Sequence, residues 1–205
     1  MIFVGVTRFS VYQPKSVEWI ASKDKEKEAQ QNDYLSYLYD EKRINYRLFT
    51  FIKLSLPLLA IGSRGFSYIH VVQYSSVMPT KFVKALKKAE AKYGFLKLVE
   101  VDTSERYERV WAAVREYFDT LKIEQKTAFG FFNLDDDDLL SIDYFKDASS
   151  YINNDRVGYY ISFGRGGTGY FDFSKKVLES ARYCYSPKIN IGLMALSSFD
   201  GKNFY

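Results

Sequence analysis

Apolar runs alternate with amphipathic segments over the first two thirds of the chain. Four short runs that are rich in apolar residues predict buried strands over residues 2–6, 66–73, 96–101 and 127–134. Between and after them, apolar residues at helical spacing predict helices over residues 43–59, 80–93, 104–121 and 142–152. Strands that alternate with helices are typical of a mostly parallel central sheet flanked by helices. The pattern therefore predicts an α/β fold.

Local signals set the expected ends of these helices. Thr80 and Ser104 are the predicted N-caps of the second and third helices, and Gly94 is expected to end the second. Pro57 is expected near the end of the first helix, because proline disrupts a helix interior. Residues 23–32 are strongly polar, which is typical of a solvated face or a mobile connection.

The pattern changes after Gly158 and predicts a C-terminal β-rich portion. We expect a strand, a glycine-rich loop, a short apolar return and a helix over residues 159–163, 164–169, 170–173 and 174–183. Asp200-Gly201 lies between two apolar runs and is a strong hairpin signal. The chain ends inside the second arm of that hairpin, so we interpret residues 1–205 as one domain of a longer parent protein.

Composition narrows the class of protein without identifying it. The chain has 205 residues, of which 47% are hydrophobic and 26% charged, as expected for a soluble globular domain. The net charge of +4 slightly favours anionic partners. This excess of positive charge is too small to indicate nucleic-acid binding, and the sequence contains no nucleic-acid-binding motif.

Several residue types argue against particular chemistries. The single Cys184 excludes an intrachain disulfide and a cysteine-based zinc cluster, and it suits a reducing compartment. The lone His70 lies in an apolar run, which argues against a Ser-His-Asp triad. The apolar run 48–62 contains Lys53 and Pro57 and is too short for a bilayer, so we interpret it as a buried helix. These observations favour a cytoplasmic protein.

Residues 135–138 are four consecutive aspartates that follow directly on the apolar run 128–134. Adjacent carboxylates repel one another unless a cation offsets their charge. Mg²⁺ and Mn²⁺ prefer oxygen ligands, and Mg²⁺ is typically held by one or two carboxylates together with substrate phosphates. The carboxyl end of a strand is where open α/β sheets bind ligands. The alternatives are an acidic surface loop or a helix N-terminus that includes Asp138, but the preceding apolar strand favours a metal-bridged phosphate site.

The segment Gly164–Gly169 matches G-x-G-x-x-G, but residues 170–173 continue as a strand instead of the helix that a dinucleotide site requires. We expect a mobile loop near the acceptor side of the site, with Arg165 available to a phosphate or an acidic acceptor; a plain surface connection is the alternative. Five lysines lie on one face of the helix over residues 80–93, which indicates a solvated face, with docking on anionic lipid as the alternative.

Several segments resemble one family, the rhamnosyltransferase-like family of GT-A type glycosyltransferases. The most specific is LDDDDL at residues 134–139, which is similar to the extended D-x-D motif of that family. Weaker similarities, which extend the resemblance over roughly the first 150 residues, are VTRFS at 6–10, RLF at 47–49, LPL at 56–58, HVVQYS at 70–75 and MP at 78–79.

The resemblance implies roles for individual residues. Asp137 would be the principal ligand of a divalent ion that bridges the donor diphosphate. Asp135 would face the nucleotide ribose or a metal-bound water, and Asp138 would support the metal site or contact the sugar. Thr7 and Arg8 would lie beside the nucleotide at the end of the first strand.

The resemblance also bears on two further positions of the motif and on the catalytic base. Asp136 belongs to the same nucleotide-binding group, but strand alternation turns its side chain away from its neighbours, so it should contribute less. The family commonly has Arg where this chain has Asn133, so one positive charge near the diphosphate is missing. An inverting reaction also needs a carboxylate base, for which Asp172 and Asp200 are candidates, although each is also explained as a structural residue.

Together, the residues and the resemblance indicate a glycosyltransferase that uses Mn²⁺ or Mg²⁺ and a nucleoside diphosphate sugar. The acceptor would be a glycan or a lipid-linked molecule in bacterial surface-polysaccharide synthesis, and the enzyme would be peripheral to the inner face of the membrane. Two alternatives stay open: a non-catalytic module that binds a nucleotide-sugar or glycan, and a metal-dependent phosphotransferase.

Overall fold

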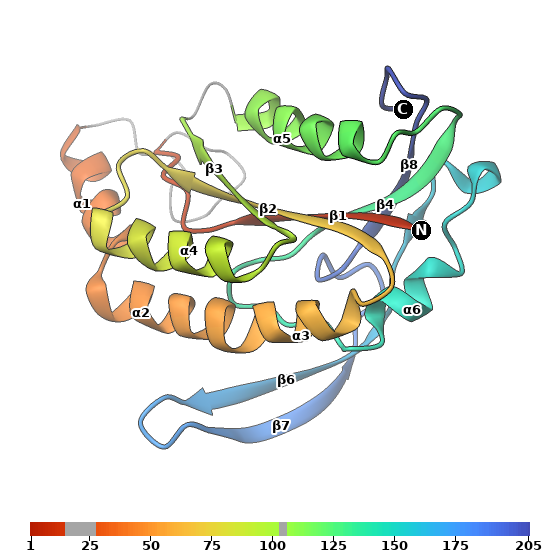
Figure 1. Cartoon of the computed structure of the whole chain (residues 1–205). Coiled ribbons are helices and arrows are strands. Elements are labelled where there is room, and N and C mark those ends of the chain that lie inside the picture. The colour runs from red at the N-terminus through yellow and green to blue at the C-terminus, as the bar shows by residue number, and fades with distance from the viewer. Residues whose placement is uncertain (15–27, 103–105) are drawn as a thin grey trace.

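The computed structural model describes residues 1–14, 28–102 and 106–205. Within these residues, six strands form one sheet in the order β3-β2-β1-β4-β8-β5 (Figure 1). The strands are β1 (Ile2–Arg8), β2 (Ser67–Ser75), β3 (Leu96–Val101), β4 (Thr127–Asn133), β5 (Tyr160–Ile161) and β8 (Met194–Phe199). The first four are parallel, whereas β8 is antiparallel to both β4 and β5. The predicted mostly parallel α/β sheet is thus confirmed.

Helices cover both faces of the sheet. Figure 1 shows α5 on one face and α2, α3, α4 and α6 on the other. The helical segments are α1 (Glu28–Leu38), α2 (Glu41–Phe49), η1 (Thr50–Ser55), α3 (Leu56–Gly62), α4 (Thr80–Lys92), α5 (Arg106–Thr120), α6 (Tyr144–Ser149) and η2 (Asn154–Arg156). β1 is buried on both sides: Phe3 packs into the core under α2–α4, and Val4 and Val6 pack into the core under α5. Such two-sided burial explains the continuous apolar runs of the parallel strands.

The segments α2, η1 and α3 form one continuous helical stretch, Glu41–Gly62. Asp40 begins it by accepting a hydrogen bond from the backbone N–H of Arg43 at 2.9 Å. The helix predicted over residues 43–59 is thus present, and it continues beyond Pro57 to Gly62. The turn before Pro57 is a π-helix, and such widened turns accommodate a residue that lacks a backbone N–H. By length and composition alone, this stretch is the one described helix that could cross a membrane.

Other predicted ends also differ. The N-cap position of α4 is Pro79, whose side chain makes no capping hydrogen bond, so Thr80 is the first helical residue. α4 ends because Tyr93 adopts an extended backbone, one residue before Gly94. The helix expected over residues 142–152 is only six residues long, because the chain turns after Ser149. Ser104 and residues 23–27 of the polar segment lie outside the described residues; residues 28–32 belong to α1.

The glycine-rich segment is a strand and not a loop. β6 (Arg165–Asp172) pairs with β7 (Val177–Tyr185) in an antiparallel hairpin, and within the described residues this hairpin joins no other strand. The helix predicted over residues 174–183 is therefore also wrong. An extra residue in β7 bulges opposite Gly169, near Ser180, which has a φ of 53°. Figure 1 shows the hairpin lying along α2 and α3, away from the central sheet.

The hairpin that Asp200-Gly201 predicts is confirmed. β8 ends at Phe199, which pairs with Phe204 in an isolated antiparallel bridge. The turn between them carries Gly201 at a φ of 93°, a left-handed conformation that glycine adopts without strain. The Asp200 carboxylate accepts hydrogen bonds from the backbone N–H groups of Lys202 and Asn203 at 2.8 and 2.7 Å. Asp200 is thus a turn residue at the end of the central sheet.

Candidate active site

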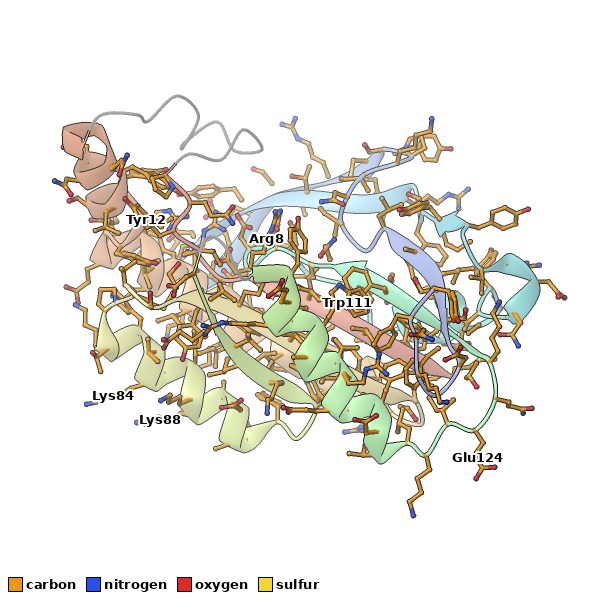
Figure 2. The ribbon with its side chains drawn as sticks, turned by 90° about the horizontal axis from the view of Figure 1, so that it is seen from above. Arg8, Tyr12, Lys84, Lys88, Trp111 and Glu124 are labelled. Carbon is orange, nitrogen blue, oxygen red and sulfur yellow. The ribbon has the colours of Figure 1, made fainter. Side chains whose placement is uncertain are left out.

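The carboxyl ends of β1 and β4 lie side by side, because these strands are parallel neighbours with Val6 opposite Asn133. The backbone N–H of Leu134 donates to the Val6 carbonyl at 3.0 Å and keeps the two segments together. Arg8 consequently reaches Asp135, with a guanidinium nitrogen 4.0 Å from a carboxylate oxygen. Figure 2 labels Arg8 at this end of β1 and Tyr12 beyond it, where Tyr12 stacks on Tyr34 of α1. Arg8 therefore lies at the acidic cluster, and its predicted place beside a nucleotide stays a prediction.

The four aspartates of the cluster differ in environment. The side chains of Asp135 and Asp137 are 50% and 51% exposed, whereas that of Asp136 is 2% exposed. The backbone N–H of Asp138 donates to the Asp135 carbonyl at 3.1 Å, which makes this segment a turn. The inward direction of Asp136 agrees with the expected alternation. Two carboxylates, those of Asp135 and Asp137, therefore remain open to a ligand.

Arg47 of α2 joins the cluster from a distant part of the chain. Its Nη1 donates to Asp136, and its Nη2 lies 2.9 Å from an oxygen of Asp137. Arg43, one helical turn earlier, donates to Ser10 at 3.2 Å, and Ser10 donates to Asp136 at 3.4 Å. Sequence reasoning missed this role of Arg47, although two arginines at i, i+4 on one helix face are a signal for a shared anionic partner. Arg47 supplies a positive charge at the cluster.

The negative charge of the four aspartates exceeds the positive charge of the arginines that contact them. Burial raises the pKa of Asp136 to about 6, against the lowering effect of Arg47. Burial also raises the pKa of Asp138 to about 6, and the charges of Asp137 and Asp135 raise it further. For Arg47, burial lowers the pKa, but the charges of Asp136 and Asp137 outweigh it, and the net shift is upward. Like-charge repulsion of this kind favours the binding of a cation.

The two exposed carboxylates do not form a complete metal site by themselves. Within the described residues, no group of three or more His, Cys, Asp or Glu side chains could hold a metal ion. Mg²⁺ is commonly bound by one or two carboxylates and completes its shell with water and phosphate oxygens. Asp135 and Asp137 supply such a pair, and their charges help to raise the pKa of Asp138, as expected where a cation would relieve repulsion between carboxylates.

Thr7 lies inside the protein and belongs to a buried hydrogen-bonded chain. Its hydroxyl donates to the Leu134 carbonyl at 2.7 Å and accepts from His70 Nε2 at 2.8 Å. His70 Nδ1 is 2.6 Å from the Tyr68 hydroxyl, which donates to it in this arrangement. Burial lowers the pKa of His70 to about 3, so the imidazole is neutral at physiological pH. Thr7 thus supports the backbone just before the acidic cluster, and its side chain is fully buried.

Asp172 is the last residue of β6, next to the turn of the β6–β7 hairpin. Its Oδ1 accepts hydrogen bonds from the Ser174 hydroxyl and backbone at 2.6 and 2.8 Å and from the Lys175 backbone at 3.1 Å. The Ser174 hydroxyl bond is the largest of the effects that lower its pKa to about 2. The next residue, Phe173, lines a hollow of about 470 Å³ together with Arg47 and Asp137. Asp172 is therefore close to the cluster in the fold but is held by its own turn.

Asp200 lies at the wrong end of the sheet for a catalytic base. Thr127, the first residue of β4, is opposite Phe199, so Asp200 follows β8 at the end where β4 begins. Asp135 follows β4 at the other end, and a strand of this length separates them by about 20 Å. Hydrogen bonds from Asn203 and Tyr205 lower the Asp200 pKa to about 2. The role predicted for Asp200 is wrong because β8 runs antiparallel.

Arg165 lies at the base of the hairpin, where a pocket of about 480 Å³ separates β6 from α6. Leu139, Leu140 and Ser141, which directly follow the acidic cluster, line one side of this pocket, and Gly164–Gly167 line another. The glycine-rich segment thus borders a pocket that begins one residue after the cluster, although it is a strand. Arg165 has no ion-pair partner among the described residues.

Comparison with known proteins identifies the family. The profile of the family described as "Putative rhamnosyl transferase" matches residues 2–198, nearly the whole chain. Neither the curated proteins nor the solved structures gave a match. The matched range includes every strand and helix that forms the acidic cluster and its surroundings. The chain therefore belongs to this rhamnosyl transferase family, and this membership supports a glycosyltransferase that uses a sugar donor and an acceptor.

Proposed function

We propose that the protein is a metal-dependent glycosyltransferase of the GT-A type that uses a nucleoside diphosphate sugar. The observation that carries the proposal is the pair of exposed carboxylates, Asp135 and Asp137, at the carboxyl end of β4. Two arginines, Arg8 and Arg47, approach the same pair from β1 and α2. Carboxylates that hold a divalent ion next to guanidinium groups form a binding site for a diphosphate.

Each residue has a distinct part in this proposal. Asp137 and Asp135 would hold Mn²⁺ or Mg²⁺ against the diphosphate, and the ion would offset the charge that develops as the nucleoside diphosphate leaves. Arg8 would contact the diphosphate directly. Asp136 would hold Arg47 in place from below, and Thr7 would fix the backbone that precedes the cluster.

The family description points to rhamnose as the first sugar to test, and we propose a glycan or lipid-linked acceptor in surface-polysaccharide synthesis. If the transfer inverts the anomeric configuration, a carboxylate must accept the proton of the acceptor hydroxyl. Of the two sequence candidates, only Asp172 lies on the side of the cluster, and its pKa near 2 makes it a weak base.

Calorimetric titration with UDP and with dTDP, in the presence and absence of Mn²⁺, tests the donor site directly. We expect nucleotide binding that requires Mn²⁺, and we expect Asp137→Asn to weaken it at least tenfold, because one charged metal ligand is lost. Asp136→Asn should reduce stability more than affinity, because its carboxylate faces inward. The matched control is Asp119→Asn, which removes an exposed carboxylate on α5 and should bind as the unmodified chain does.

Absence of Mn²⁺-dependent binding of either nucleotide would overturn the proposal. Equal losses for Asp136→Asn and Asp137→Asn would show that the metal ligands are wrongly assigned. Product analysis then separates the remaining alternatives: sugar release or transfer supports the transferase, phosphate release indicates a phosphotransferase, and binding without turnover indicates a binding module.

A further inference from the structure

The β6–β7 hairpin exposes an unusual amount of apolar surface. Five large side chains on its two strands are at least 49% exposed: Tyr170, Val177, Leu178, Tyr183 and Tyr185. Tyr183 is fully exposed, and Tyr159 and Tyr160 next to the hairpin are also exposed. We call the five hairpin residues the hairpin surface. By the register of the hairpin, Leu178, Tyr183 and Tyr185 lie on one of its faces and Tyr170 and Val177 on the other, so both faces expose apolar side chains. Exposed apolar surface of this extent on a soluble domain usually marks an interaction site.

Aromatic contacts hold the tip of the hairpin on the body of the protein. Phe173 stacks on Tyr46 of α2 with ring centroids 4.1 Å apart, and Phe171 packs on Phe49 at 5.6 Å. Its strands pair with no other strand in the described part of the chain. Isolated two-stranded hairpins are marginally stable in water. A partner that covers the hairpin surface would remove apolar side chains from water and stabilise the hairpin.

Basic side chains accompany the exposed rings. The two strands and their turn contain four basic and two acidic residues. Lys175 forms ion pairs with both acidic residues, at 3.2 Å to Asp172 and 3.0 Å to Glu179. The other three basic residues, Arg165, Lys176 and Arg182, are exposed and have no ion-pair partner within the described residues. The hairpin surface is thus surrounded by uncompensated positive charge.

We propose that the hairpin surface docks on an anionic lipid bilayer. Tyrosines combined with lysines and arginines suit the interface of such a membrane, where rings sit at headgroup level and cations attract anionic lipids. A second copy of this chain would bring the same positive charges together, so charge complementarity disfavours it. Docking here would place the membrane beside the pocket that follows the acidic cluster, because Arg165 and Cys184 belong to both the hairpin and that pocket.

A second basic surface provides an internal comparison. The lysines of α4 form a polar face, and Figure 2 shows Lys84 and Lys88 pointing outward from this helix. The large hydrophobic side chains of α4 are buried or half-buried. The α4 face has charge without apolar anchors, so it should attract anionic lipid only weakly. The hairpin combines both, and we therefore expect it and not α4 to determine binding.

Cosedimentation of the full chain with lipid vesicles, in the absence of nucleotide and metal, tests the proposal independently of the donor site. We expect binding to vesicles of phosphatidylglycerol and phosphatidylcholine, and little binding to phosphatidylcholine alone. Lys176→Gln/Arg182→Gln should weaken binding roughly tenfold or more, as should Tyr183→Ser/Tyr185→Ser. Lys84→Gln/Lys88→Gln removes two charges from α4 and should change binding less than twofold. Raising the salt concentration should weaken binding of the unmodified chain.

Each result has a defined meaning. Binding that is equal for neutral and anionic vesicles, or no binding at all, would overturn the proposal. A stronger loss with the α4 variant than with the hairpin variants would move the docking surface to α4. A concentration-dependent dimer that the tyrosine variant abolishes, without vesicle binding, would show that a second copy covers the hairpin. Because these side chains are exposed, thermal unfolding should be unchanged in all variants, and nucleotide binding reports separately on the proposed function.

Discussion

Arg47 shows how one residue gives neighbouring carboxylates different roles. Asp136 is buried and Asp137 is half exposed, yet the same guanidinium contacts both. The buried contact fixes the position of Arg47, and the exposed contact leaves oxygen atoms of Asp137 accessible to a ligand. Because Arg47 is held in this way, its long, flexible side chain is already ordered before a diphosphate binds.

We predict that Arg47→Gln destabilises the fold by roughly 2–3 kcal/mol at pH 7.5. Removing one partner of a fully buried pair costs about 3–5 kcal/mol, and Arg47 keeps some access to water. Without Arg47, the pKa of Asp136 should rise above its present value of about 6. The uncompensated carboxyl is then protonated at pH 5, so the loss of stability should be smaller there than at pH 7.5.

Urea unfolding at the two pH values measures this effect. Arg64→Gln, which removes an exposed arginine just after α3, is the matched control and should be neutral at both. The double variant Arg47→Gln/Asp136→Asn should recover part of the stability, because it leaves no unpaired buried charge. An equal loss for Arg47→Gln at pH 5 and pH 7.5 would contradict this account.

Single residues also show where sequence reasoning was sufficient. The sequence predicted that the Asp136 side chain turns away from those of its neighbours, and it does, although the segment is a turn and not a continued strand. The role of Arg47 was not predictable, because 89 residues separate it from Asp136 and only packing of α2 against the ends of the strands brings them together. The hydrogen bond between Thr7 and His70 of the neighbouring strand was not predictable for a related reason: the sequence does not show which strands are neighbours.

At the scale of elements, the segment 135–138 acts as a unit whose charge depends on pH. The pKa values of Asp136 and Asp138 are both about 6, above the ordinary value of 3.8. A raised pKa in the folded state means that the folded protein binds these protons more tightly than the unfolded chain does. Without a metal ion, the contribution of these groups to stability is therefore fully present below pH 4 and is lost as the pH rises through 6.

Metal-dependent nucleotide binding should have the opposite pH dependence. Protonation of the cluster removes the negative charge that attracts the ion, so we predict that affinity falls as the pH is lowered through 6, by up to about tenfold per pH unit for each proton taken up. Titrations with Mn²⁺ and nucleotide between pH 5 and 8 measure this profile. Asp138→Asn should make it shallower; an unchanged slope in that variant would show that Asp138 does not couple to the ion.

The β6–β7 hairpin illustrates why some elements were mispredicted. Four glycines in residues 164–169 are typical of a loop, and Val177, Leu178 and Ala181 return at nearly helical spacing. Neither local pattern shows that Arg165 pairs with Tyr185, twenty residues later, in a ladder that satisfies the backbone of both segments. By contrast, the buried parallel strands were found correctly, because burial on both faces leaves a local signal: a continuous apolar run.

At the scale of the whole molecule, the direction of one strand decides which residues can meet. β8 returns antiparallel beside β4, which carries Asp200 to the end opposite the acidic cluster. The order of strands in a sheet is a property of the complete fold, and a single sequence does not reveal it. In the same topology, the candidate active site lies at the carboxyl ends of the parallel strands, and the β6–β7 hairpin forms a sheet of its own.

We predict that the hairpin can be removed without unfolding the protein. The backbone N–H of Ser186 donates to the Gly164 carbonyl at 2.8 Å, so an Asn-Gly turn can replace residues 165–185 across this junction. Three aromatic contacts of Phe171 and Phe173 with α2 would be lost, at about 0.5–1.5 kcal/mol each. We therefore expect cooperative unfolding with a stability about 2–4 kcal/mol lower, and unchanged far-UV signals from the helices.

The shortened protein also separates the two proposals. Mn²⁺-dependent nucleotide binding should persist, because Arg8, Arg47, Asp135 and Asp137 all lie outside the removed segment. Vesicle binding should be lost together with the hairpin surface. If the shortened protein folds but no longer binds nucleotide, then the hairpin is part of the donor site, and the hollow that Phe173 shares with Asp137 is where the two would meet. If it folds and still binds anionic vesicles, the membrane surface lies elsewhere on the molecule.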